Sequence, residues 1–144
     1  MTTLERLRSV LIAIVAFGLA GTLVELLLLA HYEEAWQLLP LVLIGLAAIA
    51  LGLHASRPSA ATVRGVQTIM ASFVISGFVG TALHVRGASQ FQWEIDKSQP
   101  RWEVFKKALR AQAPPALAPG IMIQLGLLGL ASVYRHPVVK GDES

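Results

Sequence analysis

The sequence predicts an all-α, polytopic membrane protein with four transmembrane helices in a bundle, and its composition gives the first two reasons. Hydrophobic residues make up 54% of the 144 residues and charged residues 15%, against about 25% charged residues in an ordinary soluble domain. The charges are also unevenly placed, because only Glu25 lies between Arg8 and His31, and none lies between Glu34 and Arg57. A soluble protein would need polar side chains to cover such stretches.

The third reason is the length of the apolar segments, since crossing a bilayer takes about 20 mostly apolar residues. We expect spanning helices at residues 10–30, 38–55, 65–85 and 117–134. Pro40 and Pro119 fall in the first turns of the second and fourth segments, where proline is tolerated. The second and fourth segments are short, so they are expected to tilt little. The whole chain is predicted to form one domain.

The long connection between the third and fourth segments is expected to hold a short amphipathic helix over residues 99–112, with Pro100 in its first turn. Its two faces differ: Trp102, Phe105, Ala108 and Leu109 form an apolar face, and Lys106, Lys107 and Arg110 point elsewhere. Such a helix lies in the headgroup plane or forms a packing lid over the helix ends. Just before it, Phe91, Trp93 and Ile95 alternate with polar residues, which predicts a brief extended stretch.

The orientation in the membrane follows from the character of the short loops, because the 12 Lys and Arg residues divide evenly between the two sides. The first loop carries Glu33 and Glu34 without a basic residue, and the second carries Arg57 and Arg64 without an acidic one. Lys and Arg of short loops stay in the cytoplasm, and the first helix usually dominates. We therefore expect a multi-pass protein of the bacterial inner membrane with both termini in the cytoplasm.

Each predicted helix carries small residues that would allow close packing, which drives helix association in lipid together with interhelical hydrogen bonds. These residues are Gly18, Gly21, Thr22 and Glu25 in the first helix; Gly45, Ala48 and Gly52 in the second; Ser72, Ser76, Gly77, Gly80, Thr81 and His84 in the third; and Gly126, Gly129 and Ser132 in the fourth. One such face per helix is what a compact bundle requires. The same faces could instead mediate dimerisation.

Glu25 is the strongest single candidate for a functional residue, because a carboxylate inside a spanning helix costs roughly 2.5–3.5 kcal/mol on insertion scales. We expect it to face the bundle and to have a partner there, or to be protonated. The residues predicted at similar depth are His31, His84, Arg86 and Gln124. The candidate ligand-binding site therefore consists of Glu25, His84 and Gln124, with His31 or Arg86 above it. A structural bond from Glu25 to His84 or Arg86 is the alternative to a functional role.

Three chemistries compete for this site. Haem b could lie between His31 and His84, since haem iron takes axial histidine, although both residues are at helix ends. A metal ion could be held by Glu25 with His84 and His31, because carboxylate and imidazole suit zinc, iron or manganese. A proton or quinone site would have Glu25 titrating against His84. The sequence contains no P-loop, no Rossmann fingerprint, no nucleophile elbow and no cysteine, so we assign no catalytic residue.

Three stretches carry a resemblance to a known family. They are residues 24–33 (VELLLLAHYE) with Trp36 and Pro40, residues 83–87 (LHVRG) and residues 115–120 (PALAPG). In these stretches the chain resembles small bacterial four-helix integral membrane proteins that have no assigned activity. The resemblance covers most of the chain. It implies topology and bacterial origin, and it transfers no catalytic residue.

The absence of a catalytic motif, the small-residue faces and the modest size favour a non-enzymatic accessory or assembly component of the membrane. Its expected partners are the lipid bilayer and another membrane protein or further copies of the chain. Nucleic acid is not expected, because the basic residues that give the net charge of +3 lie in loops beside apolar segments. The alternative is a redox or small-ligand-binding membrane protein with haem, a metal or a quinone at the outer leaflet.

Overall fold

The computed structural model describes residues 2–110 and 119–140, and this part of the chain contains helices and no strand. The elements are α1 (Thr3–Leu28), the 3-10 helix η1 (Ala35–Gln37), α2 (Leu38–Ser56), α3 (Ala60–Ile95), α4 (Arg101–Leu109), α5 (Gly120–Ser132) and α6 (Pro137–Lys140). Three segments, Thr3–Leu28, Ala35–Ser56 and Ala60–Ile95, are long and apolar enough to cross a membrane, and α5 is apolar but has 13 residues. These apolar helices indicate a membrane protein.

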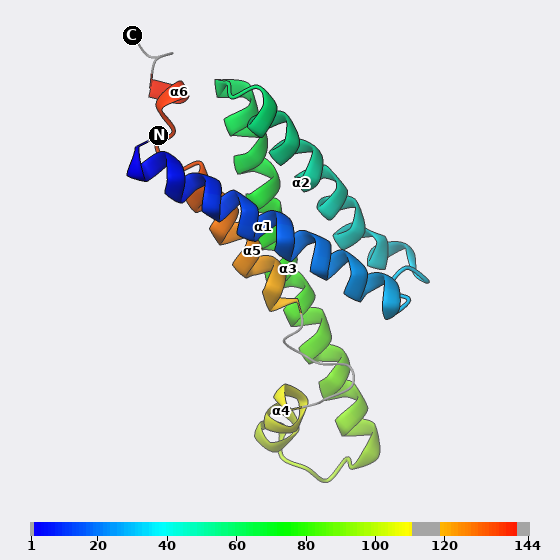
Figure 1. The fold of residues 1–144 in the computed structure, drawn as a ribbon. Coiled ribbons are helices and arrows are strands. Elements are labelled where there is room, and N and C mark those ends of the chain that lie inside the picture. Colours follow the sequence, from blue (N-terminus) through cyan, green and yellow to red (C-terminus); the bar gives the residue numbers. More distant parts are fainter. Residues whose placement is uncertain (1, 111–118, 141–144) are drawn as a thin grey trace.

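The apolar helix α5 lies between α1 and α3, and α2 packs on α3 and, less extensively, on α1 (Figure 1). The N-terminus, the turn between α2 and α3, and α6 lie at one end of the bundle, which we call the terminal side. The turn between α1 and α2 lies at the other end, which we call the loop side. On the loop side α3 continues well past the other helices and carries α4 near its end (Figure 1). This end of α3 and α4 together form an arm.

Local sequence signals explain where two helices begin. Thr2 caps α1, because its hydroxyl accepts a hydrogen bond from the backbone N–H of Glu5 at 3.2 Å and the Glu5 carboxylate accepts one from the backbone N–H of Thr2 at 2.7 Å. Ser59 and Thr62 make the equivalent reciprocal pair at the start of α3, after Pro58. Such capping boxes satisfy backbone donors that the first turn leaves without partners.

The end of α1 is a Schellman motif. The backbone N–H of Ala30 donates to the carbonyl of Leu27 at 3.1 Å, and that of His31 donates to the carbonyl of Leu26 at 2.9 Å. Ala30 takes the left-handed conformation that this motif requires, with φ of 49°. The motif stops α1 at Leu28 and fixes the position of His31 directly after the helix.

The best-packed region is the contact between α3 and α5. Met70 and Phe73 of α3 are fully buried there. A Cβ atom built on Gly126 would lie 2.7 Å from the carbonyl oxygen of Met70, and one on Gly77 would lie 2.5 Å from Cγ1 of Ile123. Only glycine allows the two backbones to come this close, so small residues determine the distance between α3 and α5.

The expected small-residue face is packed on α3 and α5, but the corresponding expectation for α2 is wrong. Around Gly45 and Gly52 of α2, and around Gly21 of α1, no described atom lies within 4 Å of the position that a Cβ would take. Ala48 of α2 is also exposed. The physical reason is that α5 fits between α1 and α3 and leaves the small residues of α2 without a facing helix.

Three expected assignments along the chain also change. Residues 86–95 are helical and continue α3, so the extended stretch expected around Phe91, Trp93 and Ile95 is wrong. Packing explains the difference, because α4 covers this part of α3 and Ala88 is buried there. The helix expected over 99–112 is observed as Arg101–Leu109, and the one expected over 117–134 as Gly120–Ser132. Residues 111–118 lie outside the described part of the chain.

Candidate functional site

The structure brings together two of the candidate site residues on the loop side. The Schellman motif presents His31 after α1, and α3 presents His84, so that their ring centroids are 6.5 Å apart. Trp36 of η1 packs edge-on against His31, with ring centroids 6.0 Å apart. Its indole N–H donates to the carboxylate of Glu34. The loop after α1 therefore places one histidine and one tryptophan against the α3 histidine.

A pocket of about 480 Å³ adjoins this pair. It is lined by Trp36, Leu83, His84, Arg86, Gly87 and Gln90. Arg86 is the last candidate residue along α3 and has an exposed side chain. The walls are mostly apolar and carry one imidazole and one guanidinium. They can therefore accept an apolar or aromatic group whose polar end faces Arg86.

Glu25 does not face the bundle, which corrects the expectation for this residue. Its side chain is exposed, and it makes no side-chain hydrogen bond or ion pair with the residues that the structure describes. The cause is the short length of α5. Leu125 of α5 packs against Gly18 of α1, and the two helices run in opposite directions. Because α5 begins only five residues before Leu125, at Gly120, it does not extend alongside the last turn of α1, where Glu25 lies (Figure 1).

Gln124 also points away from the other candidates, because its side chain is exposed on α5. The structure thus pairs His31 with His84 and leaves Glu25 and Gln124 apart from them. Among the described residues, no group of three or more His, Asp or Glu side chains could hold a metal ion.

The terminal side holds a polar cluster that was not expected from the sequence. Arg8 of α1 is buried, with a relative exposure of 8%. Its guanidinium donates to the backbone carbonyls of Tyr134 at 3.0 Å and Arg135 at 3.1 Å, just past the end of α5. A cation at this position satisfies carbonyls that the helix leaves open and opposes the negative end of the helix dipole. Arg8 therefore ties α1 to α5.

Two histidines lie in the same cluster. His54 of α2 and His136, between α5 and α6, have ring centroids 5.1 Å apart, and Nδ1 of His54 lies 3.3 Å from Oγ1 of Thr62. Burial, together with His54 and Arg8 nearby, holds the pKa of His136 below its ordinary value. The sequence did contain a signal for this pairing. With four crossings, the end of the second helix and the end of the fourth must meet on the same side.

The polar residues form two levels across the bundle. Arg8 and Glu25 are both on α1, and at 1.5 Å per residue they are about 25 Å apart along its axis. His54 and His136 share the level of Arg8, as their contacts show. The separation is close to the thickness of a bilayer hydrocarbon core, about 27–30 Å. On α3 the apolar part ends at Arg86, and the helix extends from there to Ile95, about 14 Å further.

Comparison with protein-family models, with curated proteins and with solved structures gave no match for this chain. The resemblance to small bacterial four-helix membrane proteins therefore remains an expectation from the sequence.

Proposed function

We propose that this chain is a four-span protein of the cell membrane with cytoplasmic termini, and that it acts as a non-enzymatic accessory component. In this proposal it binds a transmembrane helix of a partner membrane protein between α1 and α2. The proposal comprises a topology, a binding surface and a type of partner, and each has its own support.

The observation that carries the binding surface is an apolar groove of about 440 Å³ between α1 and α2. It is lined by Ile12, Ala16, Leu19, Ala20, Leu23, Ile44, Ala48, Leu51, Gly52 and Ala55. Small residues occur on both walls, and Gly52 has no described atom near its Cβ position. Because close packing of small residues drives helix association in lipid, a further helix would gain contacts here that the chain itself does not supply.

The charges at the ends of the groove favour a different protein over a second copy of the chain. Two exposed acidic residues, Glu33 and Glu34, lie in the turn that joins α1 to α2 at its loop-side end. A twofold dimer through this groove, with both copies in the same orientation, would bring two such acidic ends together at one level of the membrane. Like charges juxtaposed at an interface are unfavourable. A partner with a basic segment at this level would instead be attracted.

The four-span topology is supported by α5, although α5 is short. It packs along α3 and α1, and its 13 residues extend about 20 Å. It therefore covers most of the distance between the two polar levels. The acidic first loop and the basic second loop favour cytoplasmic termini, which places the arm on the outer side.

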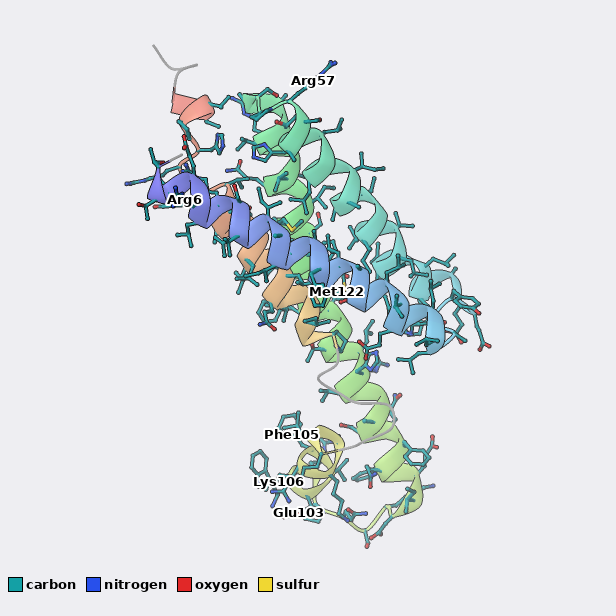
Figure 2. All side chains as sticks on the ribbon, in the orientation of Figure 1. Arg6, Arg57, Glu103, Phe105, Lys106 and Met122 are labelled. Carbon is teal, nitrogen blue, oxygen red and sulfur yellow. The ribbon has the colours of Figure 1, made fainter. Side chains whose placement is uncertain are left out.

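The arm is positioned to lie at the outer membrane surface. Phe105 lies on the side of α4 that faces the bundle, whereas Glu103 and Lys106 lie on its far side (Figure 2). Trp102 stacks on Phe105 with ring centroids 5.7 Å apart, and Lys106 pairs with Glu103 at 2.5 Å. Aromatic residues toward the lipid and charges away from it suit a helix in the headgroup layer.

Site-specific photo-crosslinking in intact cells tests the partner. A photoreactive residue in place of Ala48 should give one defined adduct with a membrane protein. Its yield should fall when Ala20→Trp fills the groove, whereas Ala82→Trp, at an exposed position of α3, should leave it unchanged. Reversing the charges with Glu33→Lys and Glu34→Lys should also lower the yield. An adduct with the mass of two copies of this chain, or adducts with lipid alone, would contradict the proposal.

A second candidate function rests on the proximity of His31 and His84 beside their pocket. In this alternative the chain binds a haem, a metal or a quinone on the loop side. The absorption spectrum and metal content of the purified protein distinguish the two candidates. A haem would give a Soret band that His84→Ala removes, and a colourless, metal-free preparation would leave only the quinone variant of this alternative.

A further inference from the structure

A further pocket lies in the arm, outside the sites discussed above. It has a volume of about 570 Å³ and lies between the end of α3 and α4. Its lining consists of Ser89, Gln90, Trp93, Glu94, Arg101, Val104 and Phe105. Small-molecule sites commonly have volumes of about 300–1,000 Å³ and combine apolar walls with a few polar groups. This pocket has both properties.

Opposite charges stand on the two walls of the pocket. Glu94 belongs to α3 and Arg101 to α4, and no ion pair joins them within the described residues. Trp93 and Phe105 add aromatic surface between them. The pocket therefore offers a carboxylate with aromatic rings for a cation, and a guanidinium for an anion. Aromatic faces bind ammonium groups, quaternary ones included, and guanidinium binds phosphate oxygens in pairs.

Four other charged residues of the arm already have partners. Asp96 accepts hydrogen bonds from the hydroxyl of Ser98 at 2.6 Å and from its backbone N–H at 2.9 Å. Lys107 donates to the side chain of Gln99 at 2.6 Å, and Lys106 is paired with Glu103. Of the charged residues that line the pocket, Glu94 and Arg101 are the ones available to a ligand.

The position of Arg101 strengthens the anionic half of the pocket. Arg101 is the first residue of α4, and Pro100 before it makes no side-chain capping bond. The start of α4 therefore adds the positive end of the helix dipole to the charge of the guanidinium. An anionic group bound by Arg101 would benefit from both.

We propose that the pocket between α3 and α4 binds a zwitterionic phosphate ester that carries an ammonium group, such as phosphoethanolamine or phosphocholine. The phosphate lies against Arg101 and the start of α4, and the ammonium lies against Glu94, Trp93 and Phe105. A simple anion would meet Glu94, and a simple cation would meet Arg101, so a ligand with both charges fits best. This inference goes beyond the accessory role, because the pocket belongs to the arm and not to the groove between α1 and α2.

The ligand could be free in solution or could be the headgroup of a phospholipid, and two arms of one experiment separate these sources. In the first, the full-length protein in a maltoside detergent is titrated with phosphocholine, phosphoethanolamine, ethanolamine and inorganic phosphate, with tryptophan fluorescence as the readout. The variant Trp93→Phe checks that the signal comes from the pocket. In the second, the protein is placed in nanodiscs of phosphatidylethanolamine or of phosphatidylglycerol, and the fluorescence of Trp93 is compared.

The zwitterionic probes should bind at least tenfold more tightly than ethanolamine or phosphate. Glu94→Gln and Arg101→Gln should each lower the affinity about three- to tenfold, because each removes one charge-assisted contact. Glu103→Gln and Lys106→Gln are the matched controls on the far side of α4 and should leave the affinity unchanged. A response in nanodiscs alone assigns the site to a lipid headgroup, and a response in detergent alone assigns it to a free ligand.

Either response supports the shared chemistry. The proposal is overturned if inorganic phosphate binds as tightly as phosphocholine and Glu94→Gln has no effect. It is also overturned if neither arm responds while circular dichroism shows that the helices are intact. Failure here leaves the Ala48 crosslink unaffected, so the two proposals can fail independently.

Discussion

The contact between α3 and α5 and the groove between α1 and α2 are built from the same kinds of residue, yet one is filled and the other is open. In the first, glycines such as Gly77 and Gly126 have backbone or side-chain atoms within 3 Å of the position that a Cβ would take. In the second, Gly52 has nothing within 4 Å of that position, and the same holds for Gly45 elsewhere on α2. Small residues in a membrane helix therefore permit close packing, but they do not show which neighbouring helix, if any, packs against them.

The difference suggests that the two regions have different roles. The α3–α5 contact holds the chain together, since it contains the fully buried Met70 and Phe73. The small residues of the groove, such as Ala48 and Gly52, are exposed and add little to the stability of the chain itself. Substitutions in the first region should affect folding, and substitutions in the second should affect association.

The largest expected effect on stability comes from placing leucine at a closely packed glycine, compared with leucine at a glycine that has no neighbour. Gly126→Leu places a side chain against the carbonyl oxygen of Met70 and against Val74, and overpacking of this kind costs about 1–3 kcal/mol. Gly45→Leu, on the open side, should cost nothing measurable. Thermal unfolding of the purified variants in detergent gives the comparison. Equal destabilisation by both substitutions would show that the two regions do not differ.

Arg8 offers the next largest effect, because it ties α1 to the end of α5. Arg8→Met keeps the apolar stem but removes two hydrogen bonds to the carbonyls of Tyr134 and Arg135. Hydrogen bonds that involve a charged group are worth about 1.5–3 kcal/mol, so we expect a loss of about 2 kcal/mol in the free energy of unfolding. Arg6→Met, at an exposed position two residues away on a different face of α1, is the control. A loss of the same size from both would contradict the role given to Arg8.

The sequence predicted some of these features and could not predict others, for identifiable reasons. The apolar helices follow from hydropathy, which depends on each segment alone. The exposure of Glu25 depends on where α5 begins relative to α1, and the helical state of residues 86–95 depends on their packing against α4. Both depend on contacts between distant segments. The pair His54 and His136 could have been deduced from the number of crossings.

Two substitutions with smaller effects are expected to stabilise the chain, one on α2 and one in the turn after α1. Gly45→Ala should raise stability by about 0.5–1 kcal/mol, because alanine favours a helix interior and has free space here, whereas Gly126→Ala should lower it. Ala30→Gly should also stabilise by about 0.5–1 kcal/mol, because φ at Ala30 is 49° and glycine adopts this conformation without strain. Both changes are measurable by thermal unfolding. A loss of stability in Ala30→Gly would show that the turn after α1 is not strained.

The smallest expected effect is a dependence on pH at the terminal side, where His136 links the α5 end to α2. Burial, His54 and Arg8 lower the pKa of His136 below 6.5 in the folded protein. Between that lowered pKa and 6.5 the unfolded chain binds more protons than the folded one, so stability falls as the pH falls through this window and is constant above it.

The titration of His136 by NMR should show a pKa below 6.5. His136→Gln should make unfolding less dependent on pH between 5 and 7, whereas His31→Gln, on the loop side, should leave the dependence unchanged. A pKa of His136 at or above 6.5 would mean that the pair opens in solution and that His136 does not link the end of α5 to α2.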